Sequence, residues 1–234
     1  MIGAMRYPGG KGKTFQHVIN LMPPHRVYIE THLGGGAVMR HKRPASHNIG
    51  IDADEQVIGN WSQRLDSEVE LRCERAEDFL TQYRFYGDEL IYADPPYYPG
   101  TRRRARVYRH DYAIEDHAQL LALLTSLPCK VVLSGYANDL YSERLQGWRS
   151  RTFAGKTHTD LREETLWFNF EPPEVLHDSR FIGDTFRARQ TTKRRLQRLQ
   201  EKVTLMHPVE RAAFSQWFSQ VYPSLASCNW SDIP

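Results

Sequence analysis

Short apolar runs alternate with amphipathic stretches along most of the 234-residue chain, and this alternation constrains the fold more than any other feature. Such runs are typical of buried parallel strands, and the stretches between them carry apolar residues at the spacing of helices. The pattern therefore predicts an α/β domain. Candidate strands lie at residues 27–31, 48–51, 69–73, 89–93, 130–134, 149–153 and 165–170. Candidate helices lie at residues 54–65, 76–83, 114–127 and 137–145.

The end of this pattern predicts a domain boundary. The last two candidate strands have no helical stretch between them, so we expect an antiparallel hairpin at the edge of a parallel sheet. Glu171-Pro172-Pro173 then ends the last strand, because proline cannot donate to a ladder. A basic helical stretch begins near Asp184. We predict one domain at residues 1–182 and a basic helical C-terminal extension at residues 183–234.

Composition excludes several classes of protein. Hydrophobic residues at 40% and charged residues at 25% exclude a disordered chain. No run approaches the roughly 18 to 20 apolar residues of a membrane span, and no secretory signal is evident. Three scattered cysteines without a C-x-x-C motif predict neither a disulfide framework nor a zinc site. We expect a folded enzyme or binding protein in the cytoplasm.

Basic charge is concentrated in two segments. Residues 183–234 hold eight Lys or Arg against four Asp or Glu, whereas the rest of the chain holds 23 against 24. A second cluster interleaves arginine with tyrosine in a loop-like segment at residues 102–109. Together they indicate a polyanion partner, although a solvated helix face or a charged loop explains either patch alone. The candidate contact residues are Arg102, Arg103, Arg104, Arg106, Tyr108, Arg109, Lys193, Arg194, Arg195 and Arg198.

A glycine triplet and an acidic residue follow two successive strands. Gly34, Gly35 and Gly36 allow a tight turn and a close approach to a ligand, but such triplets also occur in plain turns. Asp52 ends the next strand, about 20 residues on, where a carboxylate accepts hydrogen bonds from ribose hydroxyls. The pair indicates a nucleoside cofactor site without the G-x-G-x-x-G spacing of a dinucleotide fingerprint.

The N-terminal glycine-rich segment at residues 9–14 resembles a phosphate-binding P-loop only superficially. Tyr7 stands where a P-loop requires glycine, and no strand precedes the segment. Tyr7 instead offers an aromatic face to a cofactor or its cation, and Gly9 and Gly10 allow close approach. Lys11 is placed to reach a carboxylate. A flexible basic terminus is the simpler alternative.

Asp94-Pro95-Pro96-Tyr97 is the most specific motif in the chain. The two prolines fix φ after a buried strand and hold the Asp94 carboxylate and the Pro95 carbonyl in defined directions. These two acceptors match the two N–H bonds of an exocyclic amine, and Tyr97 offers a face for stacking on a base. We predict that residues 94 to 97 are catalytic.

Together, these motifs resemble the Dam-like (D12) class of S-adenosylmethionine-dependent DNA adenine-N6 methyltransferases. The resemblance covers most of residues 5–171, in the family's order, and includes a late strand at residues 162–169. It implies a Rossmann-like methyltransferase fold with a seven-stranded sheet, S-adenosylmethionine as cofactor and no metal. The cofactor residues it implies, together with those read from the motifs, are Tyr7, Gly9, Gly10, Lys11, Glu30, His32, Gly34, Gly36, Asp52 and Asp94.

Two departures from the family pattern bear on function. His32 stands where the family usually has phenylalanine, which alters a contact on the cofactor side and implies an impaired or retuned site. Only 42 positions separate Asp52 from Asp94, where larger family members carry a DNA-recognition domain. We therefore expect a short target or relaxed specificity.

The resemblance implies methyl transfer to the N6 amino group of adenine in DNA, with the base flipped out of the duplex. Two alternatives use the same amine-binding motif, namely methylation of adenine in RNA and of cytosine N4. A non-catalytic DNA-binding protein on a methyltransferase scaffold is a third. A nucleotide hydrolase is disfavoured by Tyr7 and by the missing strand before the glycine-rich segment.

Overall fold

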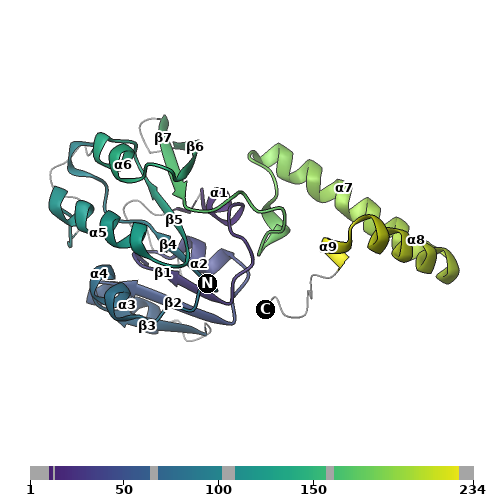
Figure 1. Ribbon diagram of the computed structural model, residues 1–234, viewed down its shortest axis with the longest axis horizontal. Helices are drawn as coiled ribbons and strands as arrows, with labels where there is room; N and C mark the ends of the chain where they lie inside the picture. The colour runs from purple at the N-terminus through teal and green to yellow at the C-terminus, as the bar shows by residue number, and fades with distance from the viewer. Residues whose placement is uncertain (1–10, 13, 64–67, 102–108, 157–160, 227–234) are drawn as a thin grey trace.

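The computed structural model describes residues 11–12, 14–63, 68–101, 109–156 and 161–226, and its centre is a seven-stranded sheet (Figure 1). The strands are β1 (Val27–Glu30), β2 (His47–Asp52), β3 (Val69–Cys73), β4 (Glu89–Ala93), β5 (Lys130–Gly135), β6 (Arg149–Lys156) and β7 (Leu161–Phe168). Their order is β3-β2-β1-β4-β5-β7-β6. β1 to β5 are parallel, whereas β7 runs antiparallel to both β5 and β6. The predicted edge hairpin is therefore confirmed.

Both faces of the sheet are buried, which explains the continuous apolar runs of its central strands. Successive residues of a strand point to opposite faces. Tyr28 and Leu90 belong to one hydrophobic cluster, and Ile29 and Ile91 belong to the other. The sheet therefore separates two apolar cores.

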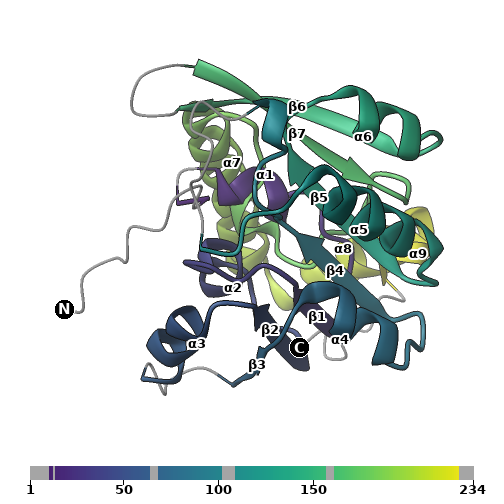
Figure 2. The ribbon, with the colours of Figure 1, turned by 90° about the vertical axis from the view of Figure 1, so that its left-hand side faces the viewer.

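Helices cover each face of this sheet (Figure 2). The first core includes residues of α1 (Phe15–Ile19), α2 (Ala37–His41) and α3 (Glu55–Ser62). The second core includes residues of α4 (Ala76–Gln82), α5 (Ile114–Ser126) and α6 (Asp139–Arg144). This three-layer architecture, with its mostly parallel sheet and antiparallel edge hairpin, is the Rossmann-like methyltransferase fold that the sequence predicts.

Helices of the C-terminal segment extend away from the sheet (Figure 1). After the 3₁₀ turn η2 (Ser179–Phe181), α7 (Phe186–Leu205) is followed by α8 (Pro208–Val221) and α9 (Pro223–Ala226). Phe181 packs edge-to-face on Phe15, but neither α7 nor α8 has a buried residue. The basic stretch predicted from residue 184 is thus helical, while the division into two domains stays a prediction.

The helices in the described ranges lack the combination of length and apolarity that a membrane span requires.

Candidate active site

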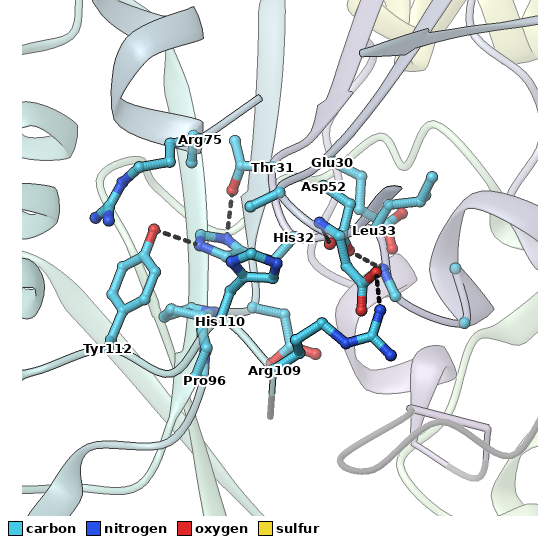
Figure 3. Close-up of a pocket in the computed structure, with 18 of the residues that line it drawn as sticks. Glu30, Thr31, His32, Leu33, Asp52, Arg75, Pro96, Arg109, His110 and Tyr112 are labelled. Carbon is cyan, nitrogen blue, oxygen red and sulfur yellow. Dashed lines mark hydrogen bonds and ion pairs between the residues drawn. The ribbon is translucent and has the colours of Figure 1, made fainter. Parts of the chain in front are cut away.

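The carboxyl ends of β1, β2, β3 and β4 meet around one cavity of about 380 Å³ (Figure 3). Its walls include the loop after β1, Asp52 at the end of β2, Arg75 after β3 and the turn at residues 94–97 after β4. Ligands of open parallel sheets bind at this edge, and the volume is that of a small-molecule site. The motifs that lie far apart in the sequence therefore share one cavity.

The glycine loop after β1 is shaped by its neighbours as well as by its own backbone. Gly34 and Gly36 adopt positive φ values of 45° and 54°. A Cβ atom at Gly36 would collide with the Trp61 ring of α3, so only glycine fits there. Trp61 Nε1 also donates a hydrogen bond to the Gly34 carbonyl oxygen at 3.1 Å. The loop is thus held against α3 in a fixed shape.

Asp52 joins this loop to the next strand. One carboxylate oxygen accepts from the Gly34 backbone N–H at 2.8 Å, and the other accepts from the Asp54 backbone N–H at 2.9 Å. Burial raises the pKa of Asp52, although these two hydrogen bonds work in the opposite direction. Each oxygen keeps a further lone pair that can accept from a ligand hydroxyl.

Asp94 is the first residue of the turn that follows β4. Two side chains hold its carboxylate. Lys11 Nζ donates to both oxygens, at 2.7 and 2.8 Å, and Ser134 Oγ donates to Oδ1 at 2.7 Å. The Tyr97 ring stacks on Tyr136, with ring centroids 4.5 Å apart. The predicted catalytic turn therefore lines the cavity with a fixed carboxylate and with the Tyr97 ring, which Tyr136 supports from outside the lining.

Lys11 contacts a residue that the sequence analysis did not single out. Its ammonium lies 2.7 Å from Glu164 Oε1 on β7, and both side chains are buried. Burial acts to lower the pKa of Lys11, but the charges of Asp94 and Glu164 help to raise it well above its usual value. Lys11 is therefore an ammonium ion. Glu164 and Ser134 lie within motifs or strands that were predicted, but nothing in their spacing marks them as site residues.

His32 forms part of the cavity wall between β1 and the segment before α5. Its Nδ1 lies 2.9 Å from Thr31 Oγ1, and its Nε2 lies 3.1 Å from the Tyr112 hydroxyl (Figure 3). Burial lowers the pKa of His32 to about 3, so the ring is neutral near pH 7. The two contacts explain how a polar ring is accommodated at a position where the family that the motifs resemble usually has phenylalanine. The cavity beside the ring stays open.

Glu30 lies at the base of the cavity and is buried. Its Oε2 accepts from the Tyr28 hydroxyl and from the Met39 backbone N–H, both at 2.9 Å. Burial raises the pKa of Glu30 to about 8. These contacts join β1 to α2, which supports the shape of the cavity from below.

Arg109 lines the cavity instead of projecting away from it. Its guanidinium donates to Asp54 Oδ1 at 3.1 Å and to Gln56 Oε1 at 2.8 Å. Contact of Arg109 with nucleic acid stays a prediction. Lys193, Arg194, Arg195 and Arg198 lie on exposed α7, apart from the cavity.

Several predicted site residues lie outside the described residues. They are Tyr7, Gly9, Gly10, Arg102, Arg103, Arg104, Arg106 and Tyr108. Within the described ranges, no group of three or more His, Cys, Asp or Glu side chains is arranged to hold a metal ion.

Comparison with known families identifies a methyltransferase domain within this chain. Residues 52–154 match the family model of the D12 class N6 adenine-specific DNA methyltransferases, which confirms the resemblance drawn from the motifs. No curated protein matches the chain.

Two of the solved structures with a similar fold are a methylase of RNA and a methyltransferase of a porphyrin. An rRNA methylase from Streptococcus thermophilus is 13% identical with a TM-score of 0.47, over 71% of this chain and 98% of that one. The magnesium protoporphyrin IX methyltransferase of Synechocystis PCC 6803, solved with bound SAM, is 14% identical with a TM-score of 0.44, over 67% of this chain and 78% of that one.

Proposed function

We propose that this protein transfers a methyl group from S-adenosylmethionine to the N6 amino group of adenine in DNA. One observation carries the proposal: Asp94 and Tyr97 line the same cavity as Gly34 and Asp52. An acceptor for an amine and a site for a nucleoside are thus adjacent. The match of residues 52–154 to the D12 family supports adenine and DNA as the substrate.

The donor set at the strand ends fits S-adenosylmethionine. Asp52 keeps lone pairs for the ribose hydroxyls, and the loop at Gly34 leaves room for the backbone to approach a ligand. When bound, S-adenosylmethionine supplies a methyl group on a sulfonium: the amine lone pair forms the new bond to carbon, and the carbon–sulfur bond breaks with its electrons on sulfur.

This chain's own groups act on the amine. One N–H donates to Asp94 and the other to the Pro95 carbonyl, which turns the nitrogen lone pair out of the ring plane. Asp94 stabilises the positive charge that develops on nitrogen, and the methylated nitrogen then releases one proton to solvent water to restore neutrality. Catalysis is therefore mainly positioning and electrostatic stabilisation.

The adenine must leave the duplex, because its N6 is not accessible while it is stacked and paired. Tyr97 provides the stacking surface for the flipped base, with a contribution of about 1 to 3 kcal/mol. The duplex is held by the arginines at residues 102–109 and by the basic residues of α7, which attract phosphates.

A catalytic role is favoured over a non-catalytic scaffold by the geometry around His32. A decayed cofactor site would leave this polar ring without partners or let it fill the cavity. Instead His32 has a polar atom within hydrogen-bond distance of each ring nitrogen, and the cavity keeps about 380 Å³. Calorimetric titration with S-adenosylmethionine checks this directly.

Nucleoside analysis after labelled methyl transfer distinguishes the candidate substrates. The purified protein is incubated with labelled S-adenosylmethionine and either duplex DNA or RNA, and the products are digested to nucleosides. We expect label in N6-methyladenine from DNA. Label in N4-methylcytosine, or in RNA alone, would replace the proposal with one of the two alternatives, and no label in either would contradict it.

A further inference from the structure

A single buried ammonium is shared by two carboxylates beneath the catalytic turn. Lys11 Nζ lies 2.7 Å from Asp94 Oδ1 and 2.7 Å from Glu164 Oε1. The exposed fractions of the three side chains are 4% for Lys11, 18% for Asp94 and 7% for Glu164. Asp94 is thus the most accessible of the three, and Glu164 lies deeper.

The hydrogen bonds of Asp94 conflict with the role proposed for it. Both of its oxygens accept from Lys11, and Oδ1 also accepts from Ser134. A substrate amine that donates to Asp94 must compete with this bidentate contact. If Lys11 releases one of its two hydrogen bonds to Asp94, the freed N–H group needs another acceptor. An unsatisfied buried charge destabilises the folded protein.

We propose that Glu164 is a positioning residue that holds the Lys11 ammonium and so leaves a lone pair of Asp94 for the substrate amino group. This inference rests on the proposed function. Glu164 needs no contact with substrate in this role, because it acts through Lys11.

The charges of the cluster agree with this role. Burial raises the pKa of Glu164, while the Lys11 ammonium acts to lower it. In the form with Glu164 ionised, two carboxylates against one ammonium give the cluster a net negative charge. A positive charge developing on the substrate nitrogen is stabilised by that excess, whereas removal of the Glu164 charge leaves Lys11 and Asp94 as a neutral pair.

The fold provides a matched control for Glu164. Residues alternate between the two faces of β7, so the preceding Glu163 is exposed while Glu164 is buried. Glu163→Gln removes the same charge from the same strand without touching Lys11. A difference between the two variants therefore reports on the contact with Lys11 and not on net charge.

The test compares wild type, Glu164→Gln, Glu164→Asp and Glu163→Gln. Steady-state methyl transfer to DNA gives kcat and KM, and calorimetry gives the affinity for S-adenosylmethionine. We expect kcat of Glu164→Gln to fall about 30-fold, with cofactor affinity within about two-fold of wild type. Glu164→Asp keeps a charge that can hold Lys11, so its kcat should lie between those of wild type and Glu164→Gln. Glu163→Gln should behave as wild type.

A second measurement isolates the amino group. Binding is compared for two duplexes that differ at the target position, one with adenine and one with purine, which lacks the amine. Wild type should prefer adenine, and Glu164→Gln should lose most of that preference because Lys11 keeps Asp94 occupied. This readout does not change if Glu164 only stabilises the fold.

Three outcomes contradict the proposal. They are an unchanged kcat in Glu164→Gln, an equal loss in Glu163→Gln, and a cofactor affinity that falls as much as kcat in both Glu164 variants. Each of these requires that wild type methylates DNA. If wild type transfers no methyl group to DNA, the proposed function is wrong and this inference falls with it.

Discussion

The strand-end cavity and the C-terminal helices are built in opposite ways. At the cavity, charged groups are buried or half-buried and are held by specific contacts: Lys11 bridges two carboxylates, and Asp52 accepts two backbone N–H groups. On α7 and α8 no residue is buried, and apolar side chains such as Leu205 and Trp217 are 84% and 49% exposed. One region is preorganised, whereas the other presents surface.

This difference indicates that the two regions have different functions. A preorganised site aligns reacting groups without further ordering, which suits group transfer. An exposed helix with arginine at positions 187, 194 and 198 presents positive charge along one side, because these spacings return to the same face. Such a surface suits a polyanion, whose binding depends on charge more than on shape. Variants of each region distinguish the two functions experimentally.

Deletion of the C-terminal segment should produce the largest separation. In a chain that ends at Ile182, the affinity for DNA at 0.15 M salt should fall about 100-fold, because the phosphate contacts of α7 are lost. Cofactor affinity should stay within about two-fold, since the cavity lies entirely within residues 11–112. Calorimetry and DNA titration measure both. A shortened chain that unfolds or loses cofactor binding would show that the two regions are not independent.

Asp52→Ala should affect the cavity alone. Loss of a charged acceptor for the ribose should weaken S-adenosylmethionine binding about 50-fold. DNA binding without cofactor should not change. Glu55→Ala, three residues on and exposed at the start of α3, serves as the control. Cofactor affinity equal to wild type in Asp52→Ala would contradict the assignment of this carboxylate.

Arg194→Ala combined with Arg198→Ala should affect the surface alone. We expect DNA affinity to fall about 10-fold and the slope of its salt dependence to decrease by about two. Gln197→Ala, on the same helix, removes no charge and should leave both unchanged. At saturating DNA, kcat of the double variant should equal that of wild type. An unchanged salt dependence would exclude this face of α7 from phosphate contact.

His32→Phe should give the smallest effect near pH 7, and its effect should appear in the pH dependence of stability. The folded pKa of His32 is lowered to about 3 from its ordinary 6.5. Between these values the unfolded chain binds a proton that the folded chain does not, so the free energy of unfolding falls as pH drops through this window. Phenylalanine cannot titrate and should make that decline shallower. An equally steep decline in the variant, measured by chemical denaturation, would show that folding does not lower the pKa of His32.

The sequence predicted the strands better than the short helices. Residues 69–73 and 89–93 were predicted with the bounds that β3 and β4 have. Every residue of β4 is buried, so its apolar run has clear ends. The hairpin strands were misjudged by several residues: β6 continues to Lys156, and β7 begins at Leu161. α1 and α2 were not predicted, because five residues are too few for a helical period to emerge.

The site was predictable where one motif contains the chemistry. Asp52 and Asp94 were found because each ends a strand, and strand ends meet at one edge. Glu164 and Ser134 were missed because they act through contacts with residues far away in the chain. The position of Arg109 was also missed, since its contact with Asp54 joins two segments 55 residues apart.

Methyl transfer by Asp94→Ala tests directly whether the turn after β4 holds an exocyclic amine beside the donor site. Single-turnover methyl transfer to DNA is measured for this variant and for wild type. Calorimetry on the same preparations gives the affinity for S-adenosylmethionine. We expect a variant that still folds and binds S-adenosylmethionine but transfers the methyl group at a rate lower by about 1,000-fold or more. A variant that transfers methyl groups at the wild-type rate would contradict it.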